Sequence, residues 1–388
     1  MTGMGAREGT DGAAPTSAGR QRFLDVLRAV ATIRVVLYHS TGNAHLSWFA
    51  AMPLMFFVGG ALYGKSLSRT PWRPLLYKRG RRILIPWTAW VVVIALVYAF
   101  TGEWRNVPWW GAIGFVFPLL PPHGPLGAAA GDLYWTWMAL WYISAYLLFM
   151  VIGIPLRRLQ QRAPWLTISA LLAPVLLSAL LGAPLVGAPT YNLLFWVLGY
   201  CYVDGLLTIR SQRLAGLAAV ACAAIAVGYA ATVSGFGLII TESPFLSVAV
   251  GCAWVLGALT LRDPITRWSA PALVAYPVEF LKQRALTVYL WHAAAVGITQ
   301  ELVNARAGHH STITFVTSTF VLTFLITLGV GWLEDYAAGR PVQVWPDLSG
   351  ARPARVLPEA EIDLREPAGS GSVRRRSRRR RVAPATRP

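Results

Sequence analysis

The chain has 388 residues, a net charge of +18 and a charged fraction of only 13%. Soluble domains carry about 25% charged residues, whereas 55% of this chain is hydrophobic and it contains 17 Trp and 14 Tyr. These values exclude an ordinary soluble domain and predict an all-α, polytopic integral membrane protein with aromatic residues at both membrane interfaces.

The first predicted span carries too many ionisable side chains for a simple anchor. It runs from Phe23 to Ser40 and contains Asp25, Arg28, Arg34 and His39. Charged groups at membrane depth are costly, so each is a candidate functional residue. Arg28 and His39 are eleven positions apart, and at about 100° per residue they share one helix face. Asp25 precedes Arg28 by three positions and can pair with it.

Two interpretations remain for each of these side chains. Arg28 is either a residue that fixes topology near the inner surface or a ligand for an anionic group, because a guanidinium binds phosphate or carboxylate with two hydrogen bonds. His39 is either a satisfied core residue or a general base for a hydroxyl. Their shared face favours the functional interpretation of both.

Apolar runs of about 20 residues predict transmembrane helices. We expect ten, at residues 23–42, 48–66, 83–101, 133–153, 165–182, 190–208, 213–233, 245–261, 285–302 and 312–333.

The loops between these spans alternate in charge. Lys and Arg gather in every second loop and in the C-terminal tail, while the other loops hold only Arg105 and Arg306. Positive residues mark cytoplasmic loops. The alternation therefore predicts that both termini are cytoplasmic and that the number of spans is even. We expect the protein in the inner or plasma membrane.

The two ends of the chain differ from the predicted membrane domain, residues 23–335. Residues 1–22 are polar and lack the apolar core of a signal peptide, which indicates a short disordered cytoplasmic leader. Residues 336–388 are rich in Pro, Gly, Ser and Arg and include RRRSRRRR at Arg374–Arg381. This composition predicts a disordered cytoplasmic tail that attracts anionic lipid, and we expect no nucleic-acid partner.

A basic stretch precedes the third predicted span. Tyr77–Trp87 reads YKRGRRILIPW, so that Lys78, Arg79, Arg81 and Arg82 fall within five positions just before the span. The charges either only set topology or bind the phosphates of a nucleotide-containing donor. In the second interpretation Arg79 and Arg82, three positions apart, lie on one helix face, and the start of the span adds its dipole.

Two further segments carry candidate residues. Leu286–Val296 reads LTVYLWHAAAV and places His292 in a span beside Tyr289; His292 either binds substrate or forms a hydrogen bond between helices. Gly59 and Gly60 follow two Phe residues in the second span, and they permit close approach of a helix or a ligand. Neither the three Cys nor the His spacing matches a metal motif, so no metal is expected.

Taken together, these motifs resemble the membrane acyltransferase-3 family over residues 20–335. The first span is similar to the family's opening, an Arg followed after ten residues by a His, which Arg28 and His39 match. KRGRRILIPW resembles its R-x-x-R motif, matched by Arg79 and Arg82, although Lys78 and Arg81 allow another register. ALWYISAYL, with Trp141, resembles a middle-span motif.

The resemblance implies an O-acyltransferase. Such an enzyme moves an acyl group, usually acetyl, from cytoplasmic acyl-CoA to a hydroxyl of a sugar, an envelope glycan, or a glycosylated or macrolide-like metabolite. His39 would be catalytic, Arg28 would support the donor, and Arg79, Arg82, Lys78 and Arg81 would bind CoA phosphates. Asp25, Tyr289, His292 and Trp141 are expected to orient or contact substrate.

One departure from the family pattern concerns the acceptor. Many members have a His before the Leu-Trp pair, whereas here Met138 and Ala139 precede Leu140 and Trp141. This puts in doubt any contact with the acceptor that the His would make.

Two other classes of protein are alternatives to an enzyme. A transporter or exporter of an anionic or glycosylated metabolite would use the helix face of Arg28 and His39 to line a permeation path. An inactive membrane scaffold is disfavoured because Arg28, His39 and the basic stretch are all present.

Overall fold

Helices form all the regular structure that we describe, which comes from a computed structural model. The structure describes residues 17–102, 141–183, 185–207, 212–234, 239–304 and 311–351, and these residues contain no strand. They belong to one compact unit, residues 1–352, whereas the second unit, residues 353–388, lies outside them. The helices are α1 (Ser17–Thr41), α2 (Ala51–Leu67), α3 (Trp72–Thr101), α7 (Trp141–Arg162), α8 (Pro164–Leu181), α9 (Ala188–Val203), α10 (Gln212–Tyr229), α11 (Pro244–Thr260), α12 (Arg262–Trp268), α13 (Ala272–Asn304), α14 (Thr312–Val330) and α15 (Trp332–Ala338), with the short helical turns η1 (Ala44–Trp48), η4 (Ala230–Ser234), η5 (Ile240–Glu242) and η6 (Ser349–Ala351).

Several of these helices fit a membrane span. Among the described residues six are long and apolar enough to cross a membrane, or seven if α11 and α12, bent by 69°, form one span. All ten predicted spans fall on helices, and the described part of the range 133–153 falls on α7. The all-α membrane fold is thus confirmed, while the number ten stays a prediction, because α1 carries several charges and α9 has only 16 residues.

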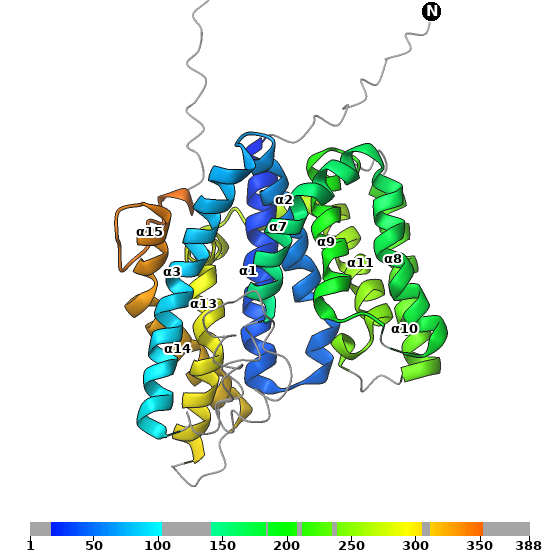
Figure 1. The fold of residues 1–388 in the computed structure, drawn as a ribbon. Helices are drawn as coiled ribbons and strands as arrows, with labels where there is room; N and C mark the ends of the chain where they lie inside the picture. The colour runs from blue at the N-terminus through cyan, green and yellow to red at the C-terminus, as the bar shows by residue number, and fades with distance from the viewer. Residues whose placement is uncertain are drawn as a thin grey trace, which may run out of the picture. The chain divides into compact units, whose positions relative to one another are not determined.

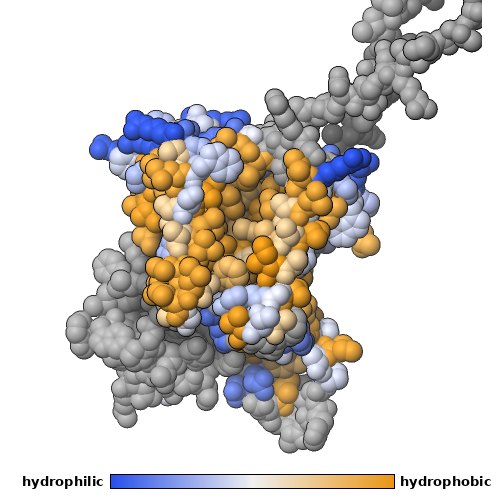
Figure 2. Space-filling model, turned by 90° about the vertical axis from the view of Figure 1, so that its right-hand side faces the viewer, coloured by the Kyte–Doolittle hydropathy of each residue, from blue (hydrophilic) through white to orange (hydrophobic). Residues whose placement is uncertain are grey.

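The flank of the bundle that carries α8 and α10 is apolar. Figure 2 shows hydrophilic residues gathered above and below an apolar middle on this side. Large exposed side chains on these helices include Leu176, Leu180, Leu217 and Val220. A surface of this kind is stable in lipid and would associate in water, so the protein is a multi-pass membrane protein.

The third predicted span begins earlier than expected. The helix α3 starts at Trp72, directly after Pro71, so that the basic stretch lies inside the helix and Pro86 lies in its buried interior. The expectation that a helix dipole begins at residue 83 was therefore wrong. Lys and Arg are good helix formers, so their charges end the apolar run without ending the helix.

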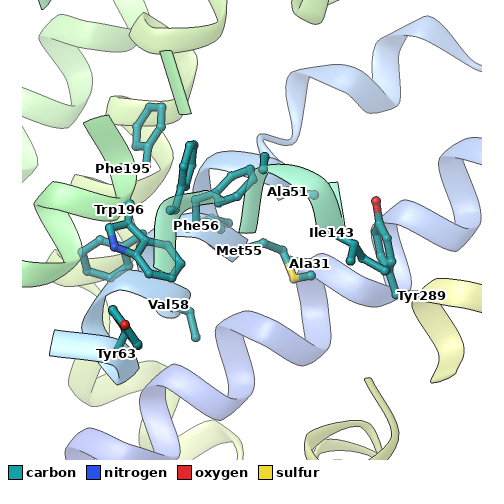
Figure 3. Close-up of a cluster of buried hydrophobic side chains, with 14 of the residues drawn as sticks. Ala31, Ala51, Met55, Phe56, Val58, Tyr63, Ile143, Phe195, Trp196 and Tyr289 are labelled. Atoms are coloured by element: carbon teal, nitrogen blue, oxygen red, sulfur yellow. The ribbon is translucent and has the colours of Figure 1, made fainter. Parts of the chain in front are cut away.

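The core forms where α2 crosses α9, and Figure 3 shows its aromatic side chains, Phe56, Tyr63 and Trp196 among them. A Cβ atom added to Gly60 would lie 2.1 Å from the backbone oxygen of Trp196, and one added to Gly199 would lie 2.3 Å from that of Phe57. The two backbones can approach this closely only because both positions lack a side chain. The expected close approach at the glycine pair is thus made by a helix.

The helix α1 lies at the centre of the described residues, against α2 and α13 (Figure 1). The helices α1 and α3 begin at the same end of the bundle, the upper end in Figure 1, and we call this the basic end because the basic stretch Lys78–Arg82 lies there. The opposite end holds the last turn of α1, with His39.

The chain stays attached to the bundle beyond the predicted start of the tail at residue 336. After α15, residues 339–351, which we call the C-terminal strap, contact α13. Fully buried Arg284 donates to Asp335 Oδ2 at 2.7 Å and to the Gln343 carbonyl at 2.7 Å, and Gln283 donates to the Asp347 carbonyl. The described chain is therefore attached to the bundle as far as Ala351. The rest of the predicted tail, residues 352–388, and residues 1–16 of the leader lie outside the described residues.

Candidate active site

A large cavity opens at the basic end, between α1, α2, α3, α7, α13 and the C-terminal strap. Its volume is about 1110 Å³. It is lined by four residues that the sequence predicts to bind the donor, Arg28, Lys78, Arg79 and Arg82. These residues come from α1 and α3, so the two motifs meet at one site.

Positive charge exceeds negative charge in this cavity. Eight Lys and Arg side chains line it against five Asp and Glu side chains. The cations are Arg28, Lys65, Arg69, Lys78, Arg79, Arg82, Lys282 and Arg340, and the carboxylates are Asp25, Glu279, Glu334, Asp335 and Asp347. An anionic ligand would therefore be attracted into the cavity.

Arg79 is held in place by neutral groups. Its guanidinium donates to Ser66 Oγ at 2.8 Å, to the Leu62 carbonyl at 3.0 Å and to Tyr146 Oη at 3.2 Å, and it lies 5.3 Å from the centre of the Tyr63 ring. None of the ion pairs among the described residues includes Arg79. It is thus a fixed cation whose charge is not neutralised by a bonded carboxylate.

Arg82 and Lys78 also line the cavity without forming an ion pair in the described part of the chain. Glu334 contributes attraction to Arg82 across the cavity. Glu334 accepts from both the backbone N–H and the hydroxyl of Thr287, at 2.8 and 2.7 Å, and burial raises its pKa above the ordinary value. The described hydrogen bonds of Glu334 come from Thr287 and not from Arg82, so Arg82 has no bonded carboxylate in the described part of the chain.

Arg81 differs from its neighbours. Its side chain donates to the carbonyl oxygens of Ala337 and Tyr336, each at 3.0 Å, at the end of α15. Arg81 does not line the cavity. The prediction that it binds the donor is therefore not supported by its position, because α15 supplies its partners.

Arg28 is tied to α1 and α13. It donates to Asp25 Oδ1 at 3.1 Å, the pairing expected from the sequence, and to the Lys282 carbonyl at 3.3 Å. Lys282 also lies 3.9 Å from Asp25 and 3.1 Å from Glu279. Both of these hydrogen bonds use Nη2, and the buried Nε has no described partner, so the guanidinium of Arg28 keeps unused N–H donors, those of Nη1 among them, for a ligand in the cavity.

His39 lies outside the cavity and meets a second histidine. His39 Nδ1 is 2.7 Å from His292 Nε2, and the two ring planes differ by only 9°. His292 is fully buried on α13, and its Nδ1 is 2.8 Å from the Tyr289 carbonyl. His292 thus makes a hydrogen bond between helices, one of the two roles left open by the sequence.

Tyr289 connects the cavity to the histidine pair. It lines the cavity together with Tyr142, and its ring centre lies 4.9 Å from that of Tyr142 and 5.7 Å from that of His292. Arg28 and His39 are separated by about 16 Å along α1 at 1.5 Å per residue. The cavity therefore ends beside the histidines without including them among its lining residues.

Trp141 does not reach the cavity. It is partly buried at the start of α7, with its ring centre 6.0 Å from that of Phe56. Its position gives a packing role and no contact with the predicted donor groups.

The sequence did not identify several residues of the cavity. Lys282 and Arg340 come from α13 and the C-terminal strap, and Arg340 lies 2.8 Å from Asp335. Lys65 lies in the last turn of α2 and Arg69 in the turn before α3, and their only signal in the sequence was their place in the positively charged segment that includes the basic stretch. Within the described ranges no group of three His, Cys, Asp or Glu side chains is placed to hold a metal ion.

Comparison with known proteins identifies the class of domain. A family model described as an acyltransferase domain, that of acyltransferase family 3, matches residues 21–332. No curated protein and no solved structure matches the chain. The matched range runs from within α1 to the end of α14 and so includes both histidines and the four basic residues of the stretch Lys78–Arg82.

Proposed function

Because the family model matches most of the chain, the chain belongs to acyltransferase family 3 and is a membrane acyltransferase. We propose that its acyl donor is acyl-CoA and that the transferred group is acetyl. The proposed acceptor is a hydroxyl of a sugar, an envelope glycan, or a glycosylated or macrolide-like metabolite. This acceptor class rests on the resemblance of the motifs.

The observation that carries the donor proposal is the set of unpaired cations in the cavity. Arg79, Arg82 and Lys78 face the cavity from adjacent turns of α3 and have no bonded carboxylate among the described residues. Coenzyme A carries its negative charge on phosphates, and guanidinium groups bind phosphate with paired, charge-assisted hydrogen bonds. The cavity volume of about 1110 Å³ is slightly above the upper value of about 1000 Å³ for ordinary small-molecule sites. The cavity is thus large enough for a donor of the size of acyl-CoA.

The orientation follows from the same charges. We place the basic end and both termini in the cytoplasm, since Lys and Arg gather in cytoplasmic loops, and the protein in the inner or plasma membrane. The donor then enters from the compartment that contains acyl-CoA. The Arg-rich tail would contact anionic lipid of the inner leaflet.

The residues have different roles according to their distance from the basic end. Arg79, Arg82 and Lys78 bind the phosphates of acyl-CoA near the basic end. Arg28, held by Asp25, uses its unused N–H groups to orient the acyl-bearing arm of acyl-CoA toward Tyr289. His39 takes the proton of the acceptor hydroxyl. As the oxygen attacks the thioester carbon, the C–O bond forms, the C–S bond breaks and CoA leaves as its thiol.

The test is acyl-CoA-dependent acylation by membranes that contain His39→Ala. We expect a loss of activity of about 10²-fold or more, the usual contribution of a general base. His45→Ala is a matched control because His45 is exposed in η1, outside the cavity. Full activity in His39→Ala would remove His39 from the mechanism.

A further inference from the structure

The hydrogen bond of His292 to the backbone determines which of its nitrogens carries a proton. A carbonyl oxygen can only accept a hydrogen bond. Since His292 Nδ1 lies 2.8 Å from the Tyr289 carbonyl, Nδ1 is the protonated nitrogen of this ring. In a neutral imidazole the other nitrogen, Nε2, then has a lone pair and accepts.

His292 is neutral in this setting. The side chain is fully buried, and none of the ion pairs of the described residues includes a histidine. A buried imidazolium without a carboxylate partner would be strongly unfavourable. His292 Nε2 therefore accepts the 2.7 Å hydrogen bond, and His39 Nδ1 is its donor.

The proton on Nδ1 leaves the lone pair of His39 on its other nitrogen. Among the described residues no hydrogen bond uses His39 Nε2. We infer that His292 is a positioning residue that, together with the Tyr289 carbonyl, fixes the tautomer of His39 and presents Nε2 as the reacting nitrogen. The inference rests on the proposed role of His39 and extends it to a second helix.

The same contact serves both states of His39. The neutral ring and the imidazolium both carry a proton on Nδ1, so the bond to His292 Nε2 persists when Nε2 takes a proton. The ring of His39 therefore does not need to rotate during the reaction, which avoids a reorganisation step.

Arg34, the nearest cation of α1 in the sequence, is engaged elsewhere. It donates to the Leu46 carbonyl at 2.7 Å and lies 4.7 Å from the centre of the Tyr38 ring.

The proton balance is complete with the proposed substrates. His39 Nε2 receives the hydroxyl proton while the acceptor oxygen forms its bond to the thioester carbon. When the C–S bond breaks, the imidazolium returns this proton to the sulfur of CoA. The two histidines end in the tautomers with which they began.

Two substitutions of His292 separate this role from simple packing. His292→Gln places an amide oxygen near the position of Nε2 and can still accept from His39. His292→Asn retains a donor for the Tyr289 carbonyl but is too short to reach His39. The acyl donor binds in the cavity, which His292 does not line, so the KM for acyl-CoA should stay unchanged in both variants.

We expect the kcat of His292→Asn to fall about 10²-fold and that of His292→Gln to remain within about tenfold of the original chain. Binding of CoA to each purified variant reports whether it is folded. An unchanged kcat in His292→Asn, or an equal loss in the two folded variants, would overturn the inference. Absence of acyl transfer by the original chain, or full activity in His39→Ala, would instead contradict the proposed function.

Discussion

At the scale of residues, adjacent arginines of one helix have different surroundings. Arg82 lines the cavity, whereas Arg81 donates to the carbonyls of Ala337 and Tyr336. Spacing predicted that Arg79 and Arg82 share a face, and they do. It could not separate Arg81 from them, because its partners come from α15, more than 250 positions later.

This difference predicts unequal effects on donor binding. Arg79→Ala and Arg82→Ala should each raise the KM for acyl-CoA about tenfold, since a hydrogen bond to a charged group contributes about 1.5–3 kcal/mol. Arg81→Ala is the matched control and should leave this KM within about twofold. The measurement is initial acylation rate against donor concentration; equal increases in all three variants would show that only bulk positive charge matters.

The histidines give the clearest limit of sequence analysis at this scale. The sequence singled out His39 and His292 separately, and it left the role of His292 open between substrate and helix. Their 2.7 Å contact joins residues 253 positions apart. Only the packing of α1 against α13 brings them together, and periodicity within either helix carries no information about it.

At the scale of elements, the contact of α2 with α9 depends on missing side chains. Gly60→Ala would place a Cβ 2.1 Å from the Trp196 carbonyl oxygen, so the helices must separate. We expect a loss of stability of about 1–3 kcal/mol, the usual cost of overpacking, seen as a lower unfolding temperature in detergent. Gly80→Ala is the control, since nothing lies within 4 Å of its added Cβ, and it should be neutral or stabilising.

The attachment of α15 to α13 depends on a buried ion pair. Asp335 lies 2.7 Å from Arg284, whose side chain has no exposed area. Asp335→Ala would leave this charge buried and uncompensated, at a cost of about 3–5 kcal/mol. Thermal unfolding should detect the loss. The pair of Arg262 with Asp263, whose carboxylate is 59% exposed, is the control, and Asp263→Ala should change stability by less than about 1 kcal/mol. Equal shifts would contradict the buried role of Asp335.

Helix existence was easier to predict than helix ends. The described part of every predicted span falls on a helix, because a long apolar run is a strong signal for a helix in a membrane protein. The start of α3 at Trp72 and the attachment of residues 339–351 were missed. Composition alone makes the charged first turns of α3 resemble a loop. It likewise makes the polar residues 339–351, which are held by buried Arg284, resemble a tail.

At the scale of the whole molecule, the cavity opens at the basic end and His39 lies near the opposite end of α1. This arrangement makes orientation testable. After replacement of the three native Cys by Ala, cysteine is introduced at exposed Tyr77 on α3 or at exposed His45 in η1. A membrane-impermeant maleimide applied to intact cells should label His45→Cys and not Tyr77→Cys. The reverse pattern would invert the proposed topology and place the cavity away from acyl-CoA.

The central claim is that a donor bound in the cavity loses its acyl group through His39. Purified protein in lipid vesicles, given acyl-CoA and a hydroxyl acceptor, should release one CoA thiol for each acylated product. His39→Ala should release the thiol at least about 10²-fold more slowly while it still binds CoA, because the cations of α3 are unchanged. A contradictory result would be undiminished product formation by His39→Ala, or movement of the unmodified acceptor across the vesicle membrane without thiol release, which is the behaviour of a transporter.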